Sequence, residues 1–200
     1  ICLNLVTGSN PQGLARQLNA LIAERGLEPA EIEGSLNFDP LENLARTGNW
    51  FENEQTDFKN LKASEELLQE GMRGICVNAN LFANAGATEA QQLGIALAMS
   101  YEYIHRLELK STRGFWVNLA VSSDYFVEIA KLRALRRLWQ SLQGELGFSK
   151  QEVRLYAETA MRNKTISDRY NNMIRTTAEA MAAIIGGASE ISVKGFDATY

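Results

Sequence analysis

Polar side chains stand near the predicted ends of several strands, where α/β proteins collect their reactive groups. Asn78 and Asn80 close the apolar run that begins at Gly74, Asn37 lies in an earlier run, and Glu158 follows a later one. Amides orient ligands through hydrogen bonds, and only the carboxyl group of Glu158 could act as an acid or base. We therefore expect a polar strand edge that is poor in catalytic groups.

Thiol and imidazole chemistry have no evident place in the sequence. Cys2 and Cys76 are the only cysteines, and both lie in apolar strand-like runs, which predicts reduced, buried thiols in a cytosolic setting. The only histidine, His105, lies in a predicted helix, far along the chain from any strand end. We expect it at the surface or at a helix end, and we predict neither a catalytic residue nor a metal site.

Composition limits the classes of partner. The chain has 200 residues, 46% of them hydrophobic, which predicts one globular unit with a sizeable core. The net charge of -4 offers no electrostatic footprint for nucleic acid or for an anionic membrane surface. No apolar run approaches the ~18–20 residues of a membrane-spanning helix. With no targeting segment visible, we expect a cytoplasmic protein.

Apolar strand-like runs alternate with amphipathic helical patterns at a spacing of about 40 residues. This alternation predicts a parallel sheet with helices outside it. The expected strands are 1–6, 33–38, 74–81, 115–121, 153–157 and 191–196. The expected helices are 12–25, 61–69, 88–108, a helix that follows Ser123 and Asp124, and 170–185.

Local signals support parts of this assignment. Thr88 precedes Gln91 by three residues, the spacing of a capping box at a helix start. The stretch 41–58 is less regular, and we interpret it as a long irregular excursion. Met161, Met173 and Met181 are interpreted as residues that pack within helices or loops.

A basic face is expected on the helix that follows Asp124. We interpret this face as solvent-exposed, with contact to a partner subunit as the alternative. Its residues are Lys131, Arg133, Arg136 and Arg137.

About six strands in 200 residues fit a doubly wound sheet or a shortened barrel, since a closed (β/α)8 barrel needs eight strands and typically ~250 residues. The chain starts and ends inside strand patterns, which favours a TIM-type barrel truncated to six parallel strands with five intervening helices. The outer strands of such a sheet lack neighbours. We predict that these edges pair with another chain, including a second copy, or that the barrel is visibly open.

Three long segments resemble one family. They are 84–93 (NAGATEAQQL), 126–139 (FVEIAKLRALRRLW) and 168–181 (DRYNNMIRTTAEAM). In this order they resemble the substrate-binding barrel of the adenosylcobalamin-dependent acyl-CoA mutases, with methylmalonyl-CoA mutases nearest. The resemblance implies that residues 1–200 form a partial barrel domain whose strands correspond to barrel strands two to seven. The D-x-H-x-x-G motif of the family's cobalamin-binding domain does not occur here.

The site positions depart from the catalytic pattern of that family. Asn80 and Leu81 stand where catalytic chains have a Tyr-His pair that contacts the thioester. Glu158 stands where the catalytic chains have a glutamine, and Asn37 stands where they have another glutamine, which is one methylene longer. Arg46 is one residue out of register with the arginine that pairs with the substrate carboxylate in those chains. The resemblance thus implies that the chain retains the barrel of the family but lacks its catalytic residues.

These departures resemble the small, non-catalytic subunit of heterodimeric methylmalonyl-CoA mutases, which interconvert methylmalonyl-CoA and succinyl-CoA. The resemblance implies a catalytic large subunit as partner and adenosylcobalamin on that chain. Asn37, Arg46, Asn78, Asn80 and Glu158 are then remnants of a substrate pocket, or polar residues that satisfy strand-end groups. The alternative is an acyl-CoA-binding or isomerising barrel in its own right, with Glu158 as acid or base. A nucleotide-binding domain is disfavoured because no G-x-G-x-x-G turn follows a strand.

Overall fold

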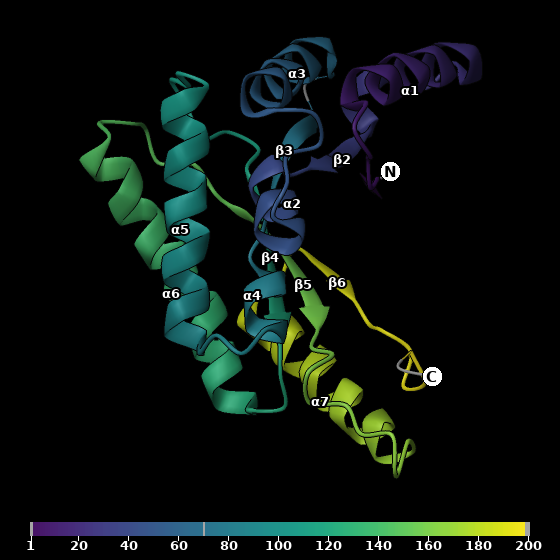
Figure 1. Cartoon of the computed structure of the whole chain (residues 1–200), viewed down its shortest axis with the longest axis vertical. Coiled ribbons are helices and arrows are strands. Elements are labelled where there is room, and N and C mark those ends of the chain that lie inside the picture. The colour runs from purple at the N-terminus through teal and green to yellow at the C-terminus, as the bar shows by residue number, and fades with distance from the viewer. Residues whose placement is uncertain (1, 70, 199–200) are drawn as a thin grey trace.

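The computed structural model describes residues 2–69 and 71–198 and contains one parallel sheet. The six strands follow one another in sequence order, so each strand pairs with the next (Figure 1). They are β1 Cys2–Asn4, β2 Glu33–Phe38, β3 Met72–Asn78, β4 Trp116–Val121, β5 Arg154–Thr159 and β6 Glu190–Ser192. The predicted number and direction of strands are confirmed.

Seven α-helices and a short 3-10 helix connect the strands within the described residues. They are α1 Pro11–Arg25, η1 Pro29–Glu31, α2 Pro40–Thr47, α3 Glu54–Leu67, α4 Asn80–Asn84, α5 Glu89–Arg106, α6 Tyr125–Glu145 and α7 Asn171–Gly186. The predicted capping box of α5 is confirmed, since Thr88 and Gln91 each accept a hydrogen bond from the other's backbone N–H.

The prediction of five helices was wrong in two places. Residues 41–58 are mostly helical, because Asp39 caps α2 ahead of Pro40 and Asn53 caps α3. The third strand ends at Asn78 rather than at residue 81, and the chain turns at once into α4. Asn80 therefore begins a helix instead of ending a strand.

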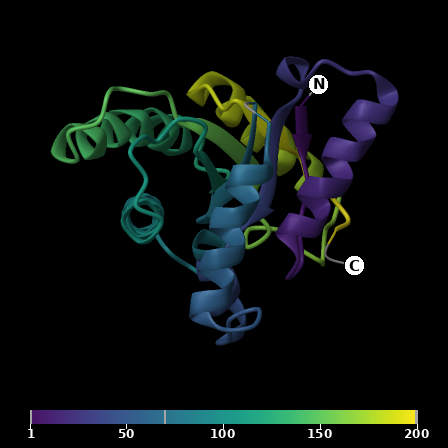
Figure 2. The same ribbon diagram turned by 90° about the horizontal axis from the view of Figure 1, so that it is seen from above.

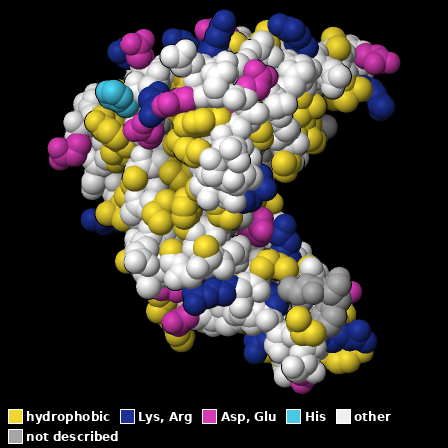
Figure 3. All heavy atoms as spheres, viewed as in Figure 1, with side chains coloured by type: hydrophobic (Ala, Val, Ile, Leu, Met, Phe, Trp, Pro, Cys, Tyr) yellow, Lys and Arg dark blue, Asp and Glu magenta, His cyan; other side chains and the backbone are white. Residues whose placement is uncertain are grey.

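The sheet is curled but open. No strand pairing joins β6 to β1 among the described residues, and the molecule has a C-shaped outline with a hollow on one side (Figure 3). The two edges still approach each other, because Cys2 and Asn4 both donate hydrogen bonds to the Glu190 carboxylate. The prediction of a visibly open barrel is confirmed. Cys2 lies on this edge and is exposed, so the prediction that it is buried was wrong.

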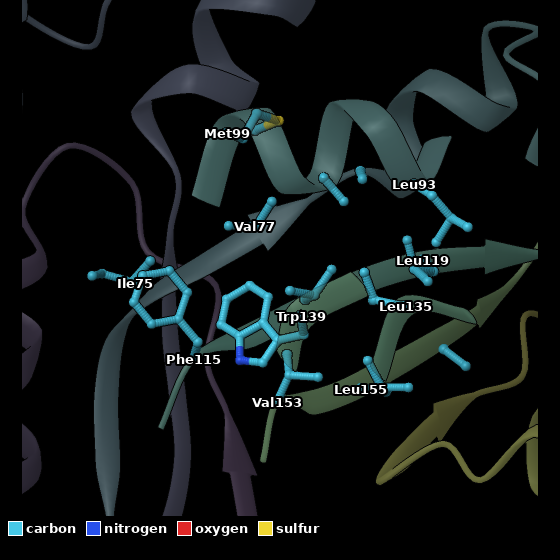
Figure 4. Close-up of a cluster of buried hydrophobic side chains, with 14 of the residues drawn as sticks. Ile75, Val77, Leu93, Met99, Phe115, Leu119, Leu135, Trp139, Val153 and Leu155 are labelled. Atoms are coloured by element: carbon cyan, nitrogen blue, oxygen red, sulfur yellow. The ribbon is translucent and has the colours of Figure 1, made fainter. Parts of the chain in front are cut away.

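The main core lies between the middle of the sheet and the helices on its outer side (Figures 1 and 2). Trp139 of α6 packs against Phe115 with ring centroids 5.4 Å apart, and Val153 lies beside them (Figure 4). β4 is buried at every position, as expected for a central parallel strand covered on both faces. This core fixes the carboxyl ends of β3, β4 and β5 relative to one another.

Two of the basic residues on α6 do not form the predicted solvent-exposed face. Lys131 is buried, where it donates a hydrogen bond of 2.6 Å to the Ala120 carbonyl and pairs with Glu128 at 2.5 Å. Arg136 donates to the Gly186 carbonyl at 3.0 Å and so joins α6 to α7. Their long side chains reach backbone acceptors that are distant in sequence, which periodicity alone does not reveal.

Helix α7 turns much of its apolar surface outward. Its buried positions include Asn172, Thr176 and Glu179, whereas Met173 and Met181 are each 49% exposed. Glu179 is stabilised in the interior by an ion pair of 2.6 Å with Lys164. The prediction that these methionines are packed was wrong, because polar residues occupy the inner face. In the described part of the chain, no helix has both the length and the apolar character needed to cross a membrane.

Candidate functional site

A cavity of about 560 Å³ opens at the carboxyl ends of the strands, and we name it the mouth cavity. All of the site residues predicted from sequence line it. They are Asn37, Arg46, Asn78, Asn80 and Glu158. The structure thus brings together residues from β2, α2, β3, α4 and β5, while their role in ligand binding stays a prediction.

Asparagine side chains connect three neighbouring strands across the floor of this cavity. Asn78 donates to the side-chain oxygen of Asn37 at 2.7 Å, and Asn118 donates to the side-chain oxygen of Asn78 at 3.1 Å. Asn37 has a left-handed backbone with φ of 49°, a conformation that asparagine tolerates better than most residues. These amides therefore bond to one another, as the structural interpretation of the site expects, but the side-chain oxygen of Asn118 has no partner among the described residues.

Asp39 is the most connected group of the mouth cavity. One carboxylate oxygen accepts from the Tyr103 hydroxyl at 2.5 Å and from the Glu42 backbone at 2.9 Å. The other accepts from the Asn78 backbone N–H at 2.7 Å. Burial raises the pKa of Asp39 to about 6, although these hydrogen bonds oppose that rise. One carboxylate thus joins β3, α2 and α5.

The charged side chains at the rim are paired locally. Arg46 contacts Glu42 at 3.0 Å within α2, and Glu158 contacts Lys194 at 3.2 Å. Because both cations, Arg46 and Lys194, already have an acidic partner, neither is free to pair with an anionic ligand in the mouth cavity. Lys194 likewise offsets the negative charge that Glu158 brings to the cavity.

Leu81 lies on the first turn of α4 and lines the mouth cavity beside Asn80. A leucine side chain neither donates a hydrogen bond nor exchanges a proton, so it cannot polarise a carbonyl group. In the part of the chain that the structure describes, no cluster of three or more histidine, cysteine, aspartate or glutamate residues could hold a metal ion.

The remaining reactive side chains lie outside this site. Cys76 is buried in β3, and burial raises the pKa of its thiol, which keeps it protonated and unreactive. His105 is exposed in the last turn of α5 and stacks on Tyr101 with ring centroids 6.1 Å apart. The predicted surface position of His105 is confirmed, as is the buried position of Cys76.

Sequence reasoning missed Asp39, Tyr103 and Lys194 as partners in the site. Asp39 carried a usable signal, since an aspartate before Pro40 and three residues before Glu42 is typical of a helix start. Tyr103 lies 64 residues from Asp39, and Lys194 lies beyond the last strand, so no local pattern indicates either contact.

Comparison with known proteins decides the family. A family model described as methylmalonyl-CoA mutase matches residues 4–200. The chain belongs to the methylmalonyl-CoA mutase family. The resemblance found in the sequence is therefore confirmed.

Curated relatives place the chain near one branch of that family. It is 33% identical to a methylmalonyl-CoA mutase small subunit of Porphyromonas gingivalis, with 94% of this chain and 32% of the relative covered. It is 34% identical to a small subunit of the same name from Streptomyces virginiae, with 96% and 32% covered. A probable mitochondrial methylmalonyl-CoA mutase of Caenorhabditis elegans is 40% identical over 42% of this chain and 11% of the relative. The chain thus spans about a third of the length of the small subunits that it matches.

Proposed function

We propose that this chain is the barrel portion of a supporting, non-catalytic small subunit of a heterodimeric adenosylcobalamin-dependent methylmalonyl-CoA mutase. Its partner in this proposal is the catalytic large subunit, and the assembled enzyme interconverts methylmalonyl-CoA and succinyl-CoA. The names of the small-subunit relatives support the assignment. We also propose a cytoplasmic location, which the two cysteines without a disulfide support.

The observation that carries the proposal is Leu81 at the mouth cavity. Stabilising a thioester oxygen as charge develops on it requires hydrogen-bond donors or a proton donor aimed at that atom. Leu81 supplies neither, and the side chain of Asn80 beside it cannot act as a general acid. The scaffold around this position is otherwise ordered, with the capped helix α5 directly after it.

The polar groups of the mouth cavity also support a structural role. The amides of Asn37, Asn78 and Asn118 bond to one another, and Glu158 is held by Lys194. A ligand that binds through these groups would have to break their present contacts, and a ligand that leaves the contacts intact would have to bind through other lining residues. Groups that serve a fixed structure are expected to bond to one another in this way, and among these amides the side-chain oxygen of Asn118 departs from that expectation because it has no partner in the described residues.

The residues of this chain do not fit a histidine-ligated cobalamin at the mouth cavity. His105 is the only histidine, and it lies at the end of α5 and outside the cavity lining. We therefore place adenosylcobalamin on the catalytic chain in this proposal.

Restoring the missing pair tests the non-catalytic role. The double variant Asn80→Tyr, Leu81→His is introduced into the complete small subunit and assayed in the assembled heterodimer. We expect turnover within about twofold of the parent, because the variant alters no reacting group. Leu81→Met serves as the size-matched control. A strong loss of turnover in the double variant with a normal control would contradict the proposal.

A second function is favoured by the size of the mouth cavity, about 560 Å³, which is adequate for part of an acyl-CoA. In that case the chain binds or isomerises an acyl-CoA itself, with Glu158 as acid or base. Isothermal titration of the complete small subunit with methylmalonyl-CoA separates the two functions. Micromolar binding would favour the second, and absence of binding favours the first.

A further inference from the structure

A second cavity lies outside the barrel wall, between α5, α6 and the ends of β4 and β5. We name it the lateral cavity. Its volume is about 270 Å³, and it shares no lining residue with the mouth cavity. None of its lining residues has a part in the proposed function.

Gln92 leaves one polar atom of this cavity wall without a partner. Its side chain is fully buried in the first turn of α5, and its amide N–H donates to the Ala79 carbonyl at 3.2 Å. No donor among the described residues reaches its amide oxygen. A buried acceptor of this kind is normally satisfied by a bound molecule or by water.

Lys131 offers the complementary donor. Its buried ammonium carries three N–H groups, of which one donates to the Ala120 carbonyl and another meets Glu128. These two contacts leave the third N–H available to a ligand. Burial lowers the pKa of Lys131, while Glu128 opposes that change. The wall therefore combines an unused acceptor with an unused donor.

The charges of the lateral cavity balance. Glu128 and Lys131 neutralise each other in the interior, and Glu89 and Arg162 line it as a further pair of opposite sign. A charged ligand would lose its hydration without a net opposite charge to meet it. Alanines fill much of the rest of the wall, which suits an apolar body.

We propose that the lateral cavity binds a small neutral molecule that carries a primary carboxamide on an apolar body. The amide N–H₂ donates to the Gln92 oxygen, and the amide oxygen accepts from the Lys131 ammonium. The apolar body lies against the alanines. This assignment concerns a cavity separate from the mouth cavity, so it stands or falls independently of the proposed function.

Three probes of one shape test the proposal by chemical-shift titration of the labelled chain. Benzamide offers both a donor and an acceptor, acetophenone lacks the donor, and benzoate carries a charge. We expect saturable binding of benzamide, and binding about tenfold weaker or worse for the other two, as the loss of one buried hydrogen bond predicts. Absence of saturation at millimolar benzamide, or equal binding of all three, overturns the proposal.

Variants locate the binding. Ala87→Leu adds bulk to the lateral cavity, whereas Ala85→Leu adds the same bulk at an exposed neighbouring position outside it. Gln92→Met removes the acceptor at similar side-chain length. We expect the first and third variants to lose benzamide binding about tenfold or more while Ala85→Leu retains it. Each variant is first checked for a cooperative thermal transition, and benzamide shifts that survive in a folded Ala87→Leu chain contradict the assignment.

Discussion

Asp39 links stability to pH at the scale of a single residue. Its folded-state pKa of about 6 lies above the value of about 3.9 of an unfolded aspartate, because burial disfavours the charged form. The stability that comes from this group is therefore fully present below about pH 3.9 and is lost as the pH rises through about 6. The full difference corresponds to about 3 kcal/mol, as an order of magnitude.

We predict that Asp39→Asn removes this component. The free energy of unfolding of the parent, relative to that of the variant, should fall as the pH rises from about 3.9 to about 6 and should level off above that range. Urea unfolding across this range measures both chains, so that contributions from other carboxylates cancel in the difference. Parallel pH profiles for the two chains would refute the role assigned to Asp39.

Tyr103 tunes the same carboxylate. Its hydroxyl donates to Asp39 at 2.5 Å and holds the pKa of that carboxyl below the value that burial alone would give. We predict that Tyr103→Phe raises the pKa of Asp39 further and costs about 1–3 kcal/mol, because a buried acceptor loses its donor. Carbon NMR of the Asp39 carboxyl reports the titration. Tyr101→Phe on the exposed side of the same helix is the control and should change neither quantity.

Gly34 controls the edge strand β1 at the scale of an element. Its φ is +140°, and a Cβ at this position would lie 1.9 Å from the Leu3 carbonyl oxygen of β1. We predict that Gly34→Ala detaches β1 and lowers stability by more than about 1 kcal/mol, since both the backbone angle and the space forbid the methyl group. Hydrogen exchange of residues 2–5 should lose protection.

Gly94 provides the matched control. It is exposed on α5, and a methyl group added there would meet nothing within 4 Å. Gly94→Ala should therefore stabilise the chain by up to about 1 kcal/mol through helix propensity. A similar loss of stability in both alanine variants would show that the steric argument for Gly34 is incorrect.

The elements with strong local signals were predictable from sequence. Thr88 and Gln91 mark the start of α5, and the buried run of β4 is largely apolar. Helix α2 was missed because Asp39 and Pro40 break a strand and start a helix at once. The outward apolar face of α7 could not be foreseen either, since the buried ion pair of Glu179 depends on Lys164, which lies outside that helix.

The candidate site was predictable as a list of strand-end residues but not as a network. Parallel strands bring their carboxyl ends to one edge, which is why Asn37, Asn78 and Glu158 meet at one cavity. Their partners come from distant elements. Lys194 pairs with Glu158 and Tyr103 with Asp39 only because the curled sheet and its helices bring them together.

The apolar face of α7 matters at the scale of the whole molecule. Ile174 and Ile184 are 71% and 64% exposed, and they lie on the same helix as the exposed methionines. Contiguous apolar surface favours association. We predict that this 200-residue chain self-associates at micromolar concentrations and that Ile174→Lys with Ile184→Lys reduces the association.

Sedimentation velocity measures this effect, with Phe126→Lys as the control. Phe126 is 80% exposed and belongs to a different helix, α6. Its replacement should leave the association unchanged. Association that persists in the α7 variant would point instead to the unpaired edges of β1 and β6, which can pair with a neighbouring copy.

The sequence-ordered sheet also bears on how the chain is made. Because every strand pairs with the strand that precedes it, each new strand finds its neighbour already synthesised. Each pairing step closes only the connection between two consecutive strands, which limits the entropic cost of loop closure at that step. The sheet is therefore suited to growth during translation, one strand and one helix at a time, from β1 towards β6.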